Sequence, residues 1–104
     1  LIASKHGLKE GSEYAEAEWL SGWLALRFIN NPGAAQQHFE NMYGAVVTPM
    51  SKARGAYWAG RAAAARGNRQ VADQWYNEAA KFQNVFYGQL AGAELGLAHA
   101  LPNA

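Results

Sequence analysis

The sequence has no cysteine, no long apolar run and almost no net charge. Without cysteine there are no disulfides, no thiolate metal ligands and no cysteine nucleophile. Nine basic residues against eight acidic ones give a formal net charge of +1, which argues against a domain that binds nucleic acid by neutralising phosphates. Charged or amide side chains interrupt every apolar stretch before the roughly 18 residues of a membrane span, so we expect no span.

The 104 residues, half of them hydrophobic, are enough for one modest domain with a core. The sequence begins at Leu1 without the basic and apolar regions of a signal peptide. We therefore expect a processed or excised piece of a larger protein.

Helix-breaking residues divide the chain into helical segments. The breaks fall at 30–33, at Thr48-Pro49 and at Gly67-Asn68. Ser12 and Ser51 are predicted N-caps, and Asn84 is predicted to start the last helix. The predicted helices span about 13–30, 32–43, 51–66, 69–82 and 85–97.

The first four predicted helices form two hairpins, about 13–43 and 51–82, that align with each other. In the first helix of each hairpin a glycine aligns, Gly22 with Gly60. In the second helix an alanine followed four residues later by an aromatic residue aligns, Ala35 with Ala72 and Phe39 with Tyr76. The spacing is slightly longer than the tetratricopeptide period of roughly 34 residues. The small residues would let paired helices approach, and the aromatic rings would fill the gap to the next hairpin.

This pattern predicts an all-α, right-handed superhelix of about five helices in tetratricopeptide-like hairpins. Stable solenoids usually need about three or more repeats. Two hairpins plus a fifth helix at about 85–97 therefore suggest one helical-repeat segment of a longer array. Uncovered repeat ends would also favour self-association.

Several segments, in this order, resemble a known family. They are Tyr14–Phe28 (YAEAEWLSGWLALRF), His38-Phe39, Thr48–Ser51 (TPMS), Ala53–Ala62 (ARGAYWAGRA) and Phe86–Ala91 (FYGQLA). Together they resemble the α-superhelical region that precedes the lysozyme-like catalytic domain of soluble lytic murein transglycosylases. The resemblance covers roughly residues 5–97.

The resemblance implies a Gram-negative periplasmic parent enzyme. Such enzymes cleave the MurNAc-GlcNAc β-1,4 bond of peptidoglycan without water and leave a 1,6-anhydro product. Their general acid and base is a glutamate followed directly by serine, in the separate catalytic domain. This sequence has no Glu-Ser pair, so we expect no catalytic residue and no cofactor in this chain. Peptidoglycan, through the parent, and the catalytic domain are the expected partners.

Carboxylates and histidines suggest no other chemistry. Glu13, Glu16 and Glu18 are expected to complement the dipole at a helix start. The three histidines, His6, His38 and His99, lack a second ligand at i+4, so no metal site is expected. His38 is predicted to be a partly exposed packing residue.

The best candidate binding surface is basic and aromatic. Arg54, Trp58 and Arg61 follow each other at i, i+4 and i+7, which places them on one helical face. They could hold the carboxylates of a peptidoglycan stem peptide and stack on a sugar ring. Alternatively, Arg54 or Arg61 reaches Glu16, Glu18 or a helix C-terminus while Trp58 packs between the hairpins, and we favour this packing interpretation.

Two further expectations concern partners. Tyr87 and Gly88, which precede the catalytic module in the family, are expected to pack against that domain. The alternative to the scaffold hypothesis is a free-standing tetratricopeptide-like adaptor that binds an acidic protein tail through Arg54, Trp58 and Arg61.

Overall fold

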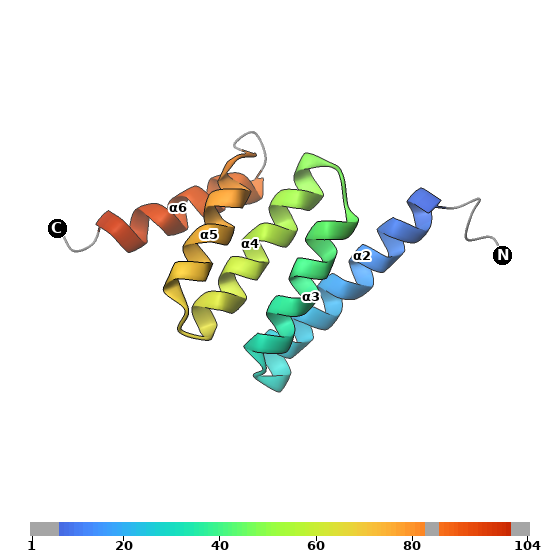
Figure 1. Cartoon of the computed structure of the whole chain (residues 1–104), viewed down its shortest axis with the longest axis horizontal. Helices are drawn as coiled ribbons and strands as arrows, with labels where there is room; N and C mark the ends of the chain where they lie inside the picture. The colour runs from blue at the N-terminus through green and yellow to red at the C-terminus, as the bar shows by residue number, and fades with distance from the viewer. Residues whose placement is uncertain (1–6, 83–85, 101–104) are drawn as a thin grey trace.

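The computed structural model describes residues 7–82 and 86–100, and every regular element in this part of the chain is a helix, without a strand. Figure 1 shows the helices side by side in sequence order. The predicted all-α class and five α-helices are confirmed. The elements are α2 (Gly7–Leu24), the short π-helix η1 (Ala25–Ile29), α3 (Pro32–Ala45), α4 (Pro49–Ala65), α5 (Arg69–Ala80) and α6 (Phe86–Ala100).

Two predicted N-caps were wrong. The first helix begins at Gly7, so Ser12 lies inside α2 and does not cap it. Thr48, not Ser51, caps α4: its hydroxyl oxygen accepts a hydrogen bond from the backbone N–H of Ser51, 3.3 Å away. Pro49 can occupy the first helical position because the N–H it lacks would have no partner there. The predicted start at Asn84 lies outside the described residues.

The other breaks follow the expected local chemistry. The side-chain oxygens of Asn31 and Asn68 accept hydrogen bonds from Ala34 N and Val71 N, and so cap α3 and α5. Gly67 adopts φ +82°, the left-handed conformation that ends α4. These hydrogen bonds fix where the chain reverses direction, and hence which helices become neighbours.

The end of the first helix has an unexpected form. Residues Ala25–Ile29 form one π-helical turn, and the carbonyl of Ala25 accepts the N–H of Asn30. Asn30 itself has φ +60°, in the left-handed region where asparagine is enriched. The predicted helix at 13–30 is therefore an α-helix followed by a wider turn.

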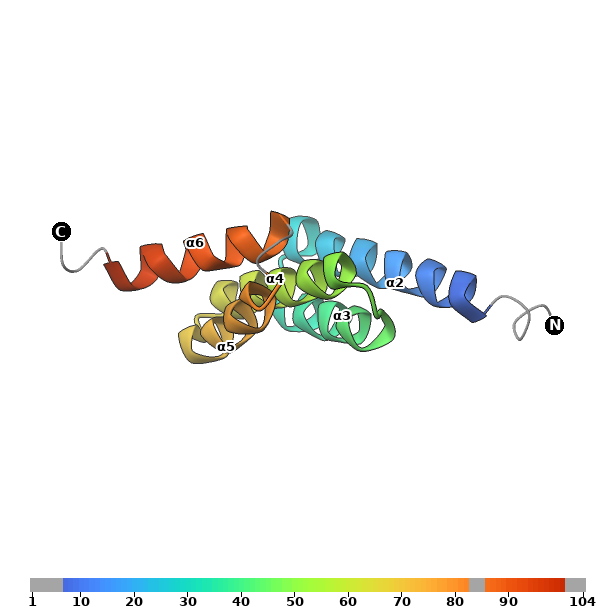
Figure 2. The same cartoon turned by 90° about the horizontal axis from the view of Figure 1, so that it is seen from above.

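Each helix packs against the next one in the chain, and α4 also contacts α6. Seen from above, α3 and α5 lie on one side of the molecule and α2 and α6 on the other, with α4 between them (Figure 2). The first hairpin is α2 with α3, and the second is α4 with α5. This arrangement gives α4 neighbours on more sides than any other described helix has.

Each hairpin is closed by an aromatic ring packed on a glycine. A Cβ added at Gly22 would lie 2.7 Å from Phe39 Cε1, and one added at Gly60 would lie 2.6 Å from Tyr76 Cε1. Both rings are almost fully buried. Phe39 also shares a buried cluster with Ala59 and Ala62 of α4, so it packs on its own hairpin and on the next one, although the sequence predicted only the second contact.

We predict that Gly60→Ala destabilises the protein and Gly44→Ala does not. The new methyl group at position 60 would overlap the buried ring of Tyr76, at a cost of about 1 to 3 kcal/mol. Gly44 lies in α3 with open space around it, so alanine there should stabilise the helix by up to about 1 kcal/mol. Urea unfolding measures both changes, and equal stability of the two variants would contradict the packing described.

Candidate functional site

The predicted binding residues lie on the side of α4 that faces α2 and α6. Arg54, Trp58 and Arg61, here called the basic-aromatic face, occupy successive turns of that helix. Each side chain is partly buried, and each has its partners inside the protein.

Arg54 links α4 to α2. Its Nη1 donates to Glu16 Oε2 at 2.8 Å, and its guanidinium lies 4.4 Å from the centroid of the Trp19 ring. The arginine side chain is 23% exposed and the glutamate 62%. The guanidinium is thus occupied by one carboxylate, as the packing interpretation predicted, and by one aromatic face, which it did not predict.

Trp58 packs in the junction between the first hairpin and α4. Its ring meets Trp19 edge-on at 6.1 Å and lies 5.9 Å from Phe39. Within the described part of the chain, the indole nitrogens of Trp19 and Trp58 are buried without a hydrogen-bond partner. Because these nitrogens are screened from solvent, they offer no hydrogen bond to a ligand at the surface.

Arg61 links α4 to α6 through a tyrosine. Its Nη1 donates to the Tyr57 hydroxyl oxygen at 3.0 Å, and that hydroxyl donates to Glu94 Oε2 at 3.3 Å. Burial raises the pKa of Tyr57, while the neighbouring Arg61 opposes the change. The guanidinium also lies over the Trp58 ring, 5.3 Å from its centroid. The basic-aromatic face therefore joins α2, α4 and α6.

The acidic cluster does not lie at a helix start, so the dipole explanation was wrong. Because α2 begins at Gly7, Glu13, Glu16 and Glu18 follow its first turn. Glu16 pairs with Arg54, and Glu18 Oε1 lies 2.6 Å from Nδ1 of His38. The sequence could not place the histidine pair, since its members stand 20 positions apart on different helices.

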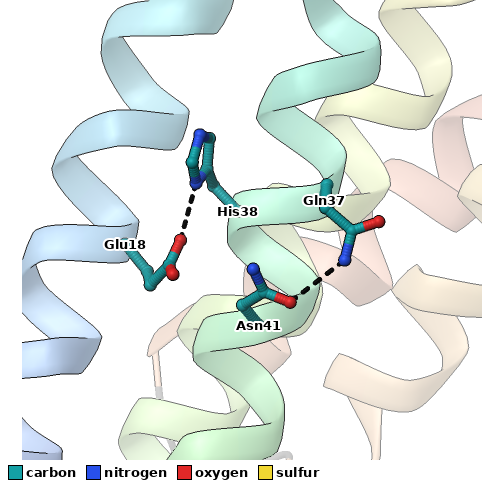
Figure 3. Close-up of polar contacts among 4 residues, drawn as sticks. All are labelled: Glu18, Gln37, His38 and Asn41. Atoms are coloured by element: carbon teal, nitrogen blue, oxygen red, sulfur yellow. Dashed lines mark hydrogen bonds and ion pairs between the residues drawn. The ribbon is translucent and has the colours of Figure 1, made fainter.

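Figure 3 shows Glu18 of α2 and His38 of α3 pointing toward each other. The short distance requires a proton on Nδ1 when the carboxylate is ionised. Burial alone would raise the pKa of Glu18, but hydrogen bonds from His38 and Tyr14 outweigh it and lower the pKa. His38, with 37% of its side chain exposed, is partly exposed as predicted, and it also pairs two helices.

A second polar cluster, which the sequence did not indicate, lies where α3, α4 and α5 meet. The Tyr43 hydroxyl donates to Glu78 Oε2, and Lys52 Nζ donates to the Tyr43 carbonyl at 2.8 Å. Burial and the glutamate raise the pKa of Tyr43 to about 12. Tyr43 and Glu78, with Gln74 and Trp75, line an open cavity of about 260 Å³.

Tyr87 and Gly88 make contacts inside the chain. The Tyr87 ring lies 5.7 Å from the Tyr57 ring, and a Cβ at Gly88 would collide with the carbonyl of Phe82. Their packing against a further domain stays a prediction.

The described residues contain no group of three or more histidine, aspartate or glutamate side chains placed to hold an ion. His6 and His99 fall outside the side chains the structure describes. None of the helices described has the length and hydropathy needed to cross a bilayer.

Comparison of the chain with protein-family models, with curated proteins and with solved structures finds no match. The site must therefore be interpreted from its own geometry.

We predict that His38→Ala raises the pKa of Glu18. The folded-state pKa lies below the ordinary value of 4.5, so this carboxylate stabilises the fold above pH 4.5 and loses that contribution as the pH falls through the folded pKa. Without His38 the loss should begin at higher pH. A ¹³C NMR titration of the Glu18 carboxyl measures the shift.

Gln37→Ala is the comparison variant on the same helix, because Gln37 bonds Asn41 (Figure 3). Asn41 contributes less than His38 to the lowered pKa of Glu18, so this change should shift that pKa less than His38→Ala does. An unchanged Glu18 pKa in His38→Ala would show that the pair does not set it.

Proposed function

We propose that this chain is a non-catalytic helical scaffold segment of a periplasmic peptidoglycan lytic transglycosylase. The resemblance of segments such as Ala53–Ala62 and Phe86–Ala91 to that family supports the assignment of the parent. The proposal includes a right-handed superhelix in which the two hairpins are consecutive repeats. Its task is to position the catalytic domain on glycan strands.

The scaffold part of this proposal is supported by one observation: the basic-aromatic face makes its contacts inside the protein. Arg54 bonds Glu16 of α2, and Arg61 bonds the hydroxyl of Tyr57 on α4 itself, which in turn donates to Glu94 of α6. A surface for stem-peptide carboxylates would need guanidinium groups without such partners. The same argument weighs against the adaptor alternative, which needs both arginines for an acidic tail.

The carboxyl groups also favour a non-catalytic role. A glycosidase acid needs a carboxyl whose pKa is raised, usually by an apolar pocket. Hydrogen bonds lower the pKa of Glu18, as shown above, and bonds from Tyr43 and Lys81 lower that of Glu78. These two groups, partnered as they are, suit structural bonds better than proton transfer to a glycosidic oxygen.

We predict that the double variant Arg54→Ala/Arg61→Ala loses stability rather than specific binding. Removing three cation-aromatic contacts and the hydrogen bonds of both arginines should lower the free energy of unfolding by about 1 to 3 kcal/mol. The control Arg27→Ala/Lys81→Ala removes the same charge from exposed positions and should cost less than about 1 kcal/mol. Urea unfolding measures both variants.

Co-sedimentation with purified sacculi then separates scaffold from ligand surface. We expect both double variants to bind sacculi alike, and neither they nor the unsubstituted chain to release anhydro-muropeptides. If Arg54→Ala/Arg61→Ala were as stable as the control but bound sacculi far more weakly, the face would be a ligand site. Capture of one periplasmic protein, lost in the same variant and without sacculus binding, would favour the adaptor.

The link to the parent enzyme has its own test. We expect the gene that encodes this chain to encode a lysozyme-like domain after residue 104, with a glutamate followed by serine at its acid position. Sequencing the locus decides this, and a gene without such a domain would refute the transglycosylase assignment while leaving the helical scaffold intact.

A further inference from the structure

The most exposed apolar surface in the described part of the first hairpin lies along α2 and η1. Leu20 is 50% exposed, Leu24 39% and Phe28 70%, at four-residue intervals that place them on one side of the helix. With Tyr14, Ala17 and Ser21, which are also exposed, these residues form a continuous strip. We call it the outer face of α2.

The internal repeat shows what this strip corresponds to in the second hairpin. Gly22 and Gly60 stand 38 positions apart and play the same part under an aromatic ring. At that spacing, the outer face of α2 corresponds residue by residue to five residues of α4 and to Arg66, the residue that caps α4. The five are Lys52, Gly55, Trp58, Ala59 and Ala62.

In α4 these six positions form the surface that packs against the preceding helix, α3. Ala59 and Ala62 are fully buried in one cluster with Phe39, and Trp58 meets the same ring. Gly55 lies under the backbone of Tyr43, since an added Cβ would be 3.2 Å from its Cα.

Polar bonds mark the two ends of the same α3–α4 contact. Lys52 bonds the carbonyl of Tyr43, and Arg66 Nη1 donates to Gln36 Oε1 at 2.8 Å. All six positions of α4 therefore belong to one helix-helix interface.

The side of α2 that faces away from the outer face is buried, and so is the corresponding side of α4. Ala15 and Ala25 are 4% and 5% exposed, and their equivalents Ala53 and Ala63 are fully buried. Among the described residues, α4 thus has a helix against both of these sides, whereas the outer face of α2 has none and the contacts of α2 with α3 and α4 lie elsewhere on that helix. The uncovered side carries Leu24 where α4 has alanine, and Phe28 where it has arginine.

We propose that the outer face of α2 binds an amphipathic helix of the α3 type, presented by a further hairpin of the same repeat. Such a helix carries alanine followed four residues later by an aromatic residue and then by a second one, as Ala35, Phe39 and Tyr43 do in α3. Ala17 and Ser21 leave room for these rings, as Gly55 and Ala59 do in α4.

The composition of α6 argues against that helix of a second copy as the occupant. Its exposed positions include Phe86 at one end and the small residues Gly92, Ala93 and Gly96. No alanine of α6 is followed four residues later by an aromatic residue, so the helix lacks this spacing, which α3 has. The inference rests on the repeat packing within the scaffold proposal and not on peptidoglycan, so the sacculus experiment and the one below can fail independently.

The test uses the whole chain and a fluorescein-labelled peptide of residues 31–46, the α3 sequence, as the helical probe. We expect saturable binding by fluorescence anisotropy at peptide concentrations up to about 1 mM, with NMR shift changes at Leu20, Leu24 and Phe28. Leu24→Glu should weaken binding at least about tenfold, as should Phe39→Ala in the peptide.

Val47→Glu is the matched control, because Val47 is 79% exposed and lies away from the outer face; it should leave binding unchanged. Circular dichroism verifies that Leu24→Glu remains folded. Absence of binding, or binding equal in Leu24→Glu and Val47→Glu, would overturn the proposal. Concentration-dependent dimers in sedimentation velocity that Leu24→Glu abolishes would also overturn it, because the occupant would then be a second copy.

Discussion

The packing of an aromatic ring on a glycine is the contact on which the rest of this structure depends. Phe39 lies on Gly22 and Tyr76 on Gly60, so the two helices of each hairpin approach more closely than side chains at both positions would allow. That close approach brings His38 within reach of Glu18. It also holds the first hairpin where Trp58 can pack against Phe39 and Trp19. Phe39, Tyr76 and Met42 are the largest fully buried side chains in the described part of the chain.

Helix α4 supplies the small side chains against which these rings pack. Its buried positions are almost all alanine or glycine, with Tyr57 as the exception. Small side chains on a central helix leave space that rings from α3 and α5 occupy, and each deleted ring would therefore open a large void. The polar side chains at the edge, Arg54 and Arg61, then join the outer helices to the centre.

Local chemistry made much of the fold predictable. Pro32, Pro49 and Gly67 mark helix ends by fixed or unusual backbone angles, so the breaks were found from neighbours in sequence. The start of the first helix was missed because Gly11 and Ser12 resemble a break, whereas the chain continues through both in helical form.

Most contacts of the candidate site could not be predicted from the sequence, because they join residues that lie far apart in it. The ion pair between Arg54 and Glu16 could be anticipated as one alternative, since both residues lie on helices expected to be close. The bonds from Tyr43 to Glu78 and from His38 to Glu18 could not. They require the rotation of each helix about its own axis, which is set only when the rings dock on their glycines.

The π-helical turn at Ala25–Ile29 keeps the two hairpins in register although they differ in length. Gly22 and Phe39 are 17 positions apart, whereas Gly60 and Tyr76 are 16 apart. A π turn accommodates one residue more than an α turn, so the extra residue is absorbed at the helix end and the ring still meets its glycine. An insertion or deletion in such a repeat can thus be taken up at the end of one helix without rotating the next helix out of contact.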